Sequence, residues 1–289
     1  MSTVSVIIPT YNSGNTLRLA LESVLQQDYA NFEVWVVGDG CTDDSADVVA
    51  SFGDDRAQWL NLPQNSGTPS LPRNEGYRRA IGKYIAYLGH DDLWFPRHLS
   101  RLIECIESTS SDFVFSLGIL IGPAGVEHTF GLPVRAWDHK RAISPSNWLH
   151  RKNLVDIAGA WLSGVKMGDD RVFLERIQAS AARIDFCQSL SVLKFPSASW
   201  KMYTRGSDLP QLAYARAIRQ DARELTLKLL TEVGARMARQ EVKCEHAVNL
   251  PRPMRALVEW IMDKYGHQRW PLNDFLYWLW RRRAGLDSK

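Results

Sequence analysis

The sequence predicts an α/β fold, in which a mostly parallel sheet is flanked by helices and followed by a helical C-terminal extension. Short apolar runs alternate with segments of helical spacing through the N-terminal third of the chain. The apolar runs are near-continuous, as in strands that a parallel sheet buries on both faces. The chain has 289 residues, which is enough for one large α/β domain and a helical appendage.

Strands and helices alternate in order through the N-terminal third. The first strand is an apolar run stopped by Pro9, and the first helix carries Leu17, Leu21 and Val24 on one face. Strands joined by helices form parallel sheets with right-handed crossovers. The expected elements are strand 4–9, helix 15–27, strand 32–37, helix 45–52, strand 58–62, helix 72–81 and strand 84–88.

The rest of the chain is more mixed. Its clearest elements are helix 96–108, strand 112–116 and helix 169–179, and from about residue 208 the chain becomes helical and charged. We expect one α/β domain over 1–206 and a helical region over 207–289.

The composition excludes several classes of protein. The formal net charge is only +3, so the chain lacks the basic field of a nucleic-acid-binding protein. Its four cysteines are scattered without a CxxC pair, which argues against a zinc site or a disulfide framework and fits a reducing cytosol. No stretch reaches the roughly 18 apolar residues of a spanning helix, and the N-terminus lacks the layout of a signal peptide. We therefore expect a soluble cytoplasmic protein that is at most peripheral to a membrane.

Two carboxylates, Asp91 and Asp92, follow the apolar run that ends at Leu88. Mg²⁺ and Mn²⁺ take oxygen ligands, usually one or two protein carboxylates completed by substrate phosphates. Paired acids at the end of a strand therefore suit a divalent cation held against a phosphate. An Asp-Asp pair is also a common loop opening and helix N-cap, and the pair alone leaves both interpretations open.

Polar loops follow three of the predicted parallel strands, at 10–12, 38–40 and 89–92. Ligands of such sheets bind at the carboxyl ends of the strands. We therefore expect these loops to share one edge of the sheet.

Five segments of the chain resemble the motifs of inverting family 2 glycosyltransferases of the GT-A fold. They come in the family's order and at familiar separations, and the likeness extends to about residue 180. The resemblance makes 1–206 a GT-A domain, with a nucleotide-sugar-binding half at 1–95 and an acceptor-binding half at 96–206. The segments are 4–12, 37–43, 65–67 with 73–76, 87–94, and Gly168-Asp169-Asp170 with Phe173.

The resemblance implies transfer of a sugar from a nucleotide-diphosphate donor, favoured to be a UDP-sugar, to a hydroxyl of a glycan or a lipid-linked acceptor. It implies Mn²⁺ or Mg²⁺ as cofactor, with Asp91 as the metal ligand. Asp170 matches the catalytic base, with Asp169 beside it. The implied contacts of the nucleotide sugar are Pro9, Thr10, Tyr11, Asp39, Arg73, His90, Asp91 and Asp92.

For some of these residues the resemblance also implies which part of the donor they contact. Pro9, Thr10 and Tyr11 would surround the uracil and ribose, and Asp39 would accept the uracil N3–H. Arg73 falls where the family often places a basic residue near the diphosphate or the acidic cluster.

The chain departs from the family's pattern in three places. Gly38 and Gly89 stand where relatives usually carry the leading acids of two motifs, which puts tight metal and donor binding in question. His90 would add a nitrogen ligand or be an ordinary loop residue. Asp169 replaces a glutamate that is one methylene longer, so the sequence leaves open whether Asp169 or Asp170 reaches the acceptor.

This set of residues suits an inverting displacement. A divalent ion bridging both phosphates would stabilise the leaving diphosphate, with Asp92 orienting water or a sugar hydroxyl. One carboxylate takes the acceptor's proton, which is typically worth about 10²–10⁴-fold in rate. A second carboxylate acting as nucleophile is required in a retaining glycosidase but not here.

Simpler interpretations stand beside the functional ones. Asp169 and Asp170 would favour the dipole at a helix N-terminus, and Asp39 would belong to a plain Asp-Gly turn. The segment 65–67 would be a turn and nothing more, and Arg73 an ordinary surface arginine.

Two other functions compete with the glycosyltransferase. A nucleotidyltransferase would need a glycine-rich, lysine-containing loop after the first strand, and the chain has Pro9-Thr10-Tyr11-Asn12 there. A degenerate family member would bind nucleotide or glycan, or scaffold a synthase complex, without turnover. The acids missing at Gly38 and Gly89 favour that alternative, and the retained aspartates oppose it.

The segment 274–283 combines aromatic residues with three consecutive arginines. Such a segment suits an interfacial helix on the inner face of an anionic membrane, near a lipid-linked acceptor. The alternative, which we favour, is that its rings pack on the catalytic domain or on a second subunit of a homo-oligomer.

Overall fold

The computed structural model describes residues 3–130, 143–165, 168–196, 200 and 209–238. The segment 274–283 lies outside the described residues, so its expected contact with a membrane or a subunit stays a prediction.

The N-terminal part forms the predicted parallel sheet. Its strand order is β3-β2-β1-β4, and Val4 of β1 pairs in parallel with Phe32 of β2 and Tyr84 of β4. Burial of all seven residues of β1 explains the near-continuous apolar run in the sequence. The strands are β1 (Val4–Thr10), β2 (Phe32–Gly38), β3 (Ala57–Asn61) and β4 (Tyr84–Tyr87).

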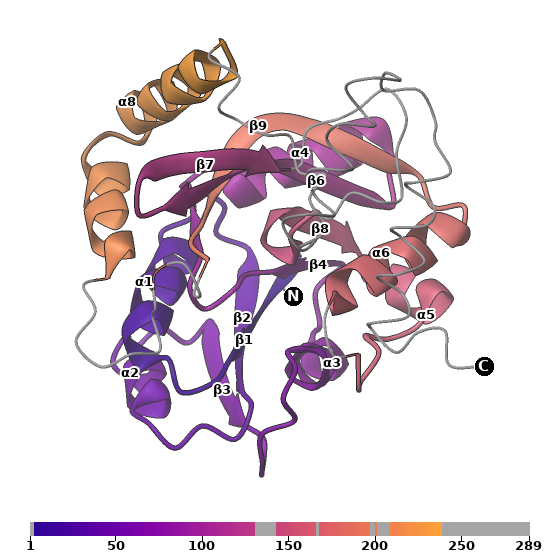
Figure 1. Ribbon diagram of the computed structural model, residues 1–289. Helices are drawn as coiled ribbons and strands as arrows, with labels where there is room; N and C mark the ends of the chain where they lie inside the picture. The colour runs from indigo at the N-terminus through magenta and orange to yellow at the C-terminus, as the bar shows by residue number, and fades with distance from the viewer. Residues whose placement is uncertain (1–2, 131–142, 166–167, 197–199, 201–208, 239–289) are drawn as a thin grey trace, which may run out of the picture.

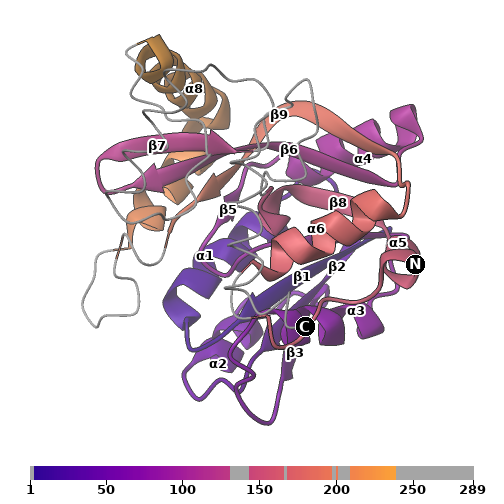
Figure 2. The same ribbon diagram turned by 45° about the vertical axis from the view of Figure 1, so that its right-hand side comes forward.

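Helices cover both faces of these strands (Figures 1 and 2). Alternate residues of β1 point to opposite faces, so that Val6 and Ile8 join one core cluster and Ile7 joins another. The first cluster packs α1, α2 and α4, and the second packs α5 and α6. The helices are α1 (Gly14–Leu25), α2 (Ser45–Ala50), α3 (Ser70–Arg79), α4 (His98–Thr109), α5 (Leu154–Ala158) and α6 (Asp169–Ala179).

The sheet continues beyond β4 as a mixed sheet. β8 is antiparallel to both β4 and β6, β9 is parallel to β6, and β5 and β7 are antiparallel to β9 and β6. The α/β class is confirmed, and the antiparallel strands are confined to this second half. Its elements are β5 (Leu93–Trp94), β6 (Phe113–Gly122), β7 (Gly125–Phe130), the 3₁₀ turn η1 (Pro145–Asn147), β8 (Trp148–Arg151) and β9 (Ile184–Lys194).

A cluster of buried rings ties the start of α6 to the end of β4. Trp161 stacks on Phe173 of α6 with ring centroids 4.3 Å apart, and its edge meets Tyr87 of β4 at 5.2 Å. The indole N–H of Trp161 donates to the Tyr87 hydroxyl over 3.1 Å. Aromatic pairs of this kind add to the free energy of burial and fix the relative orientation of the elements that carry them.

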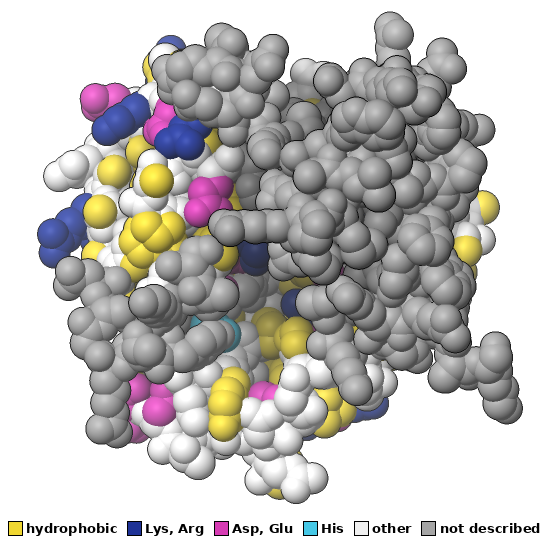
Figure 3. All heavy atoms as spheres, in the orientation of Figure 1, with side chains coloured by type: hydrophobic (Ala, Val, Ile, Leu, Met, Phe, Trp, Pro, Cys, Tyr) yellow, Lys and Arg dark blue, Asp and Glu magenta, His cyan; other side chains and the backbone are white. Residues whose placement is uncertain are grey.

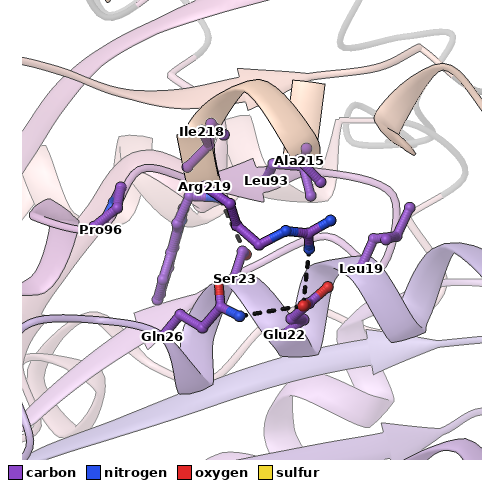
Figure 4. A pocket seen from close by; sticks show the side chains of 10 residues that line it. Leu19, Glu22, Ser23, Gln26, Leu93, Pro96, Ala215, Ile218 and Arg219 are labelled. Carbon is purple, nitrogen blue, oxygen red and sulfur yellow. Dashed lines mark hydrogen bonds and ion pairs between the residues drawn. The ribbon is translucent and has the colours of Figure 1, made fainter. Parts of the chain in front are cut away.

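The described part of the C-terminal extension is the helix α8 (Pro210–Ala238), which lies beside β7 (Figures 1 and 2). The helix is broken at Asp221, whose carboxylate accepts the N–H groups of Arg223 and Glu224 and so caps the second segment. The first segment reaches α1, where Arg219 forms an ion pair of 2.8 Å with Glu22 across a small pocket (Figure 4). Within the described part of the chain, no helix is long and apolar enough to cross a membrane.

Candidate active site

The three polar loops after β1, β2 and β4 meet at one edge of the sheet, as predicted. The Asp39 N–H donates to the Thr10 carbonyl over 2.8 Å, and His90 Nδ1 lies 3.3 Å from the Pro9 carbonyl. A hollow on this face of the molecule exposes hydrophobic, basic and histidine side chains (Figure 3). Tyr11 is exposed in its loop, whereas Thr10 is buried.

Asp39 is buried at the end of β2 and holds a neighbouring loop. Both of its carboxylate oxygens accept the Ser66 N–H at 3.0 Å, and one also accepts the Ser66 hydroxyl at 3.0 Å. The segment 65–67 is therefore more than a turn, because it is tied to the motif that follows β2. A carboxylate has about four acceptor positions, which leaves room for a further donor, and the predicted contact with a base stays a prediction.

A side chain at Gly38, where the family resemblance implied an acid, would be crowded. A Cβ at this position would lie 2.5 Å from the Asn61 amide oxygen and 2.7 Å from the Trp59 ring. Asn61 uses the same oxygen to accept the Cys41 N–H over 2.8 Å. The loop is thus closed by side chains of β3 in place of a carboxylate.

Asp91 and Asp92 occupy different environments although they are adjacent. Asp92 is completely buried, and its carboxylate accepts the Ser146 hydroxyl at 2.5 Å and the Phe195 N–H at 3.3 Å. Through these contacts Asp92 holds the loop 89–92 in place. Its expected contact with water or a sugar hydroxyl stays a prediction. Asp91 is partly exposed, and its carbonyl accepts the buried Gln211 amide of α8 over 3.0 Å.

Gly89 lets this loop fold tightly around both acids. A Cβ at Gly89 would lie 2.9 Å from Asp92 Oδ2 and 3.0 Å from Asp91 Oδ1. An acid at this position would therefore place a third carboxylate against the first two.

Lys194, at the end of β9, is a member of the site that the sequence did not reveal. Its ammonium lies 3.1 Å from Asp92 Oδ2. Burial acts to lower the pKa of Lys194, but the attraction of Asp92 and Asp91 outweighs burial and raises it. Lys194 is therefore a cation at neutral pH.

The second acidic pair begins α6. Asp169 accepts hydrogen bonds from Arg73 at 2.7 Å and from the Ser70 hydroxyl at 2.9 Å, both on α3. The Arg73 guanidinium also lies over the Trp161 ring, 4.2 Å from its centroid. Arg73 is thus a partner of the acidic pair, and an ordinary surface role for it is excluded by its burial.

Asp170 differs from Asp169 in its partners. Its carboxylate accepts the Arg171 N–H over 2.8 Å. Burial and the neighbouring charge of Asp169 raise the pKa of Asp170, against the opposing attraction of Arg73 and Lys194. The charge of Lys194 acts on Asp91, Asp92 and Asp170. Arg73 and Trp161 link Asp169 to Tyr87 near the end of β4, so both acidic pairs lie toward this end of the strand.

Comparisons with known proteins agree with this arrangement. The family model "Glycosyl transferase family 2" matches residues 5–166, more than half of the chain. The chain therefore belongs to glycosyltransferase family 2.

Individual relatives match over shorter stretches. An uncharacterised glycosyltransferase of Rickettsia felis is 40% identical over 113 residues, which are 39% of this chain and 18% of the relative. An Escherichia coli protein, UDP-Glc:alpha-D-GlcNAc-diphosphoundecaprenol beta-1,3-glucosyltransferase WfgD, is 33% identical over 112 residues, 39% of this chain and 44% of the relative. These matches cover less than half of either relative.

A solved structure shares the fold. The crystal structure of S. aureus TarS 1-349 in complex with UDP-GlcNAc matches 75% of this chain and 70% of the TarS chain, with a TM-score of 0.61 and 23% sequence identity. The GT-A fold that the sequence predicts is thereby confirmed.

Proposed function

We propose that the chain is an inverting glycosyltransferase that moves a sugar from a UDP-sugar to a hydroxyl of a glycan or a lipid-linked glycan precursor. The observation that carries the proposal is that both acidic pairs lie toward the end of β4, beside the loops of β1 and β2: Asp91 and Asp92 follow the strand, and Arg73 and Trp161 link Asp169 to its Tyr87. WfgD by its name uses UDP-Glc and a diphosphoundecaprenol acceptor, and the TarS structure holds UDP-GlcNAc. Both names favour a uridine donor, and the WfgD name favours an acceptor of this kind.

The geometry favours Asp170 as the general base. Asp169 is engaged by Arg73 and Ser70, so its carboxylate is held in place as the partner of α3. Asp170 lies beside it with a raised pKa, which brings a carboxylate closer to the pH at which a base works best.

In the proposed step the acceptor oxygen attacks the anomeric carbon on the face opposite the diphosphate. The new C–O bond forms as the bond to the β-phosphate oxygen breaks, and the electron pair of that bond stays on the phosphate. The acceptor's proton passes to Asp170. One displacement inverts the configuration at the anomeric carbon.

The residues suit the divalent cation that the family implies if the ion takes some of its ligands from the protein and the others from the bound donor. Among the described residues no group of three or more His, Cys, Asp and Glu side chains could hold a metal ion. Asp91 would supply one carboxylate, and the phosphates would supply further oxygens, as is usual for Mg²⁺. When bound, the ion would act as a Lewis acid on the leaving diphosphate.

Turnover with a panel of UDP-sugars tests the proposal. Proton NMR of the product should show the anomeric configuration opposite to that of the donor, with UDP released in equal amount. An acceptor mixture should include undecaprenyl-diphosphate sugars, in view of the WfgD name. Retention of configuration would contradict an inverting mechanism. UDP binding without any turnover across the panel would favour the non-catalytic alternative.

The helix α8 should contribute to this site through Gln211. Replacing Gln211 with alanine would leave the Asp91 carbonyl without its buried donor, a loss worth about 1–3 kcal/mol. We expect a lower melting temperature and weaker UDP binding, measured by thermal denaturation and calorimetry. Leu212→Ala is the matched control, because Leu212 is exposed on the same turn of the helix. Equal UDP affinity in the Gln211 variant and wild type would contradict the role.

A further inference from the structure

Strand pairing fixes the position of Lys194 relative to the acidic loop. Leu93 of β5 lies opposite Leu193 of β9, and Trp94 lies opposite Val192. In an antiparallel ladder the next pair in this register is Asp92 with Lys194, in agreement with the 3.1 Å separation of their charged atoms. The rigid sheet, and not a loop, therefore presents this ammonium to the site.

Lys194 retains capacity to bind a further anion. Among the described residues its ammonium makes one hydrogen bond, to Asp92, although an ammonium carries three donors. Asp92 has other donors in the Ser146 hydroxyl and the Phe195 N–H. The Lys194 side chain is 34% exposed, whereas Asp92 is completely buried.

The charges of the site create a need for such a cation. A nucleotide diphosphate bound beside Asp91 would add negative charge to a region that already holds two acidic pairs. Within the part of the chain that the structure describes, Arg73 is the cation at the Asp169-Asp170 pair, and it is held by Asp169 and by the face of Trp161. Lys194 lies instead at the Asp91-Asp92 side, where the donor's phosphates would bind.

We infer that the Lys194 ammonium binds the diphosphate of the nucleotide-sugar donor and stabilises the charge left on it when the anomeric C–O bond breaks. The inference rests on the proposed function. In a family member with an acid at the position of Gly89, that acid would help to hold a metal, and the metal would stabilise the leaving diphosphate. The inference assigns part of this stabilisation to the Lys194 ammonium.

The test compares UDP with uridine, which lacks the phosphates. Lys194→Met removes the charge and keeps an unbranched side chain of nearly the same length. We expect it to lower UDP affinity about tenfold or more, the effect of losing a charge-assisted hydrogen bond, and to leave uridine affinity unchanged. Calorimetry measures UDP binding and saturation-transfer NMR measures uridine binding. Lys194→Arg should recover most of the UDP affinity.

Lys83→Met is the matched control, because Lys83 forms an exposed ion pair with Glu107 outside the site. It should bind both ligands as wild type does. If Lys194→Met fails to fold because Asp92 loses its counter-ion, the double variant Asp92→Asn with Lys194→Met removes both charges and keeps a partner for Ser146. This double variant should show the same selective loss of UDP affinity when it is compared with Asp92→Asn alone.

The outcomes separate this inference from the proposed function. An unchanged ratio of UDP to uridine affinity in a folded Lys194→Met protein would overturn the inference and leave Lys194 as a counter-ion of Asp92 alone. A wild-type protein that binds neither ligand would overturn the proposed function and the inference with it.

Discussion

Replacing Asp170 with asparagine is expected to lower the rate of sugar transfer about 10²–10⁴-fold, the usual worth of a general base, and to leave UDP binding unchanged. The amide cannot take the acceptor's proton but occupies the same space at the start of α6. Single-turnover kinetics and UDP titration measure the two effects separately. A rate within a few fold of wild type would show that Asp170 is not the base.

The pH dependence of the transfer rate is a second test of Asp170 as the general base. Because the pKa of Asp170 is raised by burial and by Asp169, the wild-type rate should fall as the pH drops through that raised pKa, where the base becomes protonated. Asp170→Asn should lack this limb of the profile. The raised pKa also means that the charged form is disfavoured in the folded protein, so the variant should be at least as stable as wild type at neutral pH.

Asp169→Asn is the comparison for Asp170→Asn, because Asp169 is the neighbouring acid and its carboxylate accepts hydrogen bonds from Arg73 and Ser70. It should weaken the anchoring of α6 and keep the acidic limb that belongs to Asp170, moved to lower pH because the neighbouring charge that raises the pKa of Asp170 is gone.

Replacing Asp91 with asparagine is expected to abolish the enhancement of UDP binding by Mn²⁺ and to lower transfer by about 10²-fold or more, since a Lewis acid on the leaving group is worth several kcal/mol. Asp91 is the partly exposed member of its pair, whereas the oxygens of Asp92 are engaged inside the protein. UDP titrations with and without Mn²⁺ measure the effect.

Asp47→Asn serves as the control for this substitution, because Asp47 is exposed on α2 and outside the site. A Mn²⁺ enhancement that survives in Asp91→Asn would exclude Asp91 as the ligand.

The N-terminal half of the fold was predictable because its signals are local. Buried parallel strands leave near-continuous apolar runs, and the helices between them have one apolar face. Predicted and observed boundaries differ by only a few residues, as for the first helix, expected at 15–27 and found at Gly14–Leu25.

The second half was less predictable because its strands are short or irregular. β5 has two residues, and the pairing of β9 with β6 shifts register twice. Neither strand leaves a regular alternation of apolar and polar residues in the sequence. The strand expected at 112–116 is observed as the longer Phe113–Gly122, whose second half pairs with β7 and β9.

The residues of the candidate site likewise divide into those that the sequence predicts and those that it does not. Asp39, Asp91 and Asp170 follow or begin clear elements within recognisable motifs, so the sequence pointed to them. Lys194 and Gln211 reach the acidic loop from sequence positions about a hundred residues away. The signal that could have drawn attention to Lys194 is a charged residue within an otherwise apolar run, between Leu193 and Phe195.

Calorimetric titration of UDP into the wild-type protein, with CDP, GDP and dTDP as alternatives and with or without Mn²⁺, tests the central claim most directly. A nucleotide-sugar donor site predicts that UDP binds in preference to the other three and that Mn²⁺ tightens its binding. Failure of all four nucleotides to bind in the presence of Mn²⁺ would contradict the claim that this edge of the sheet is a donor site.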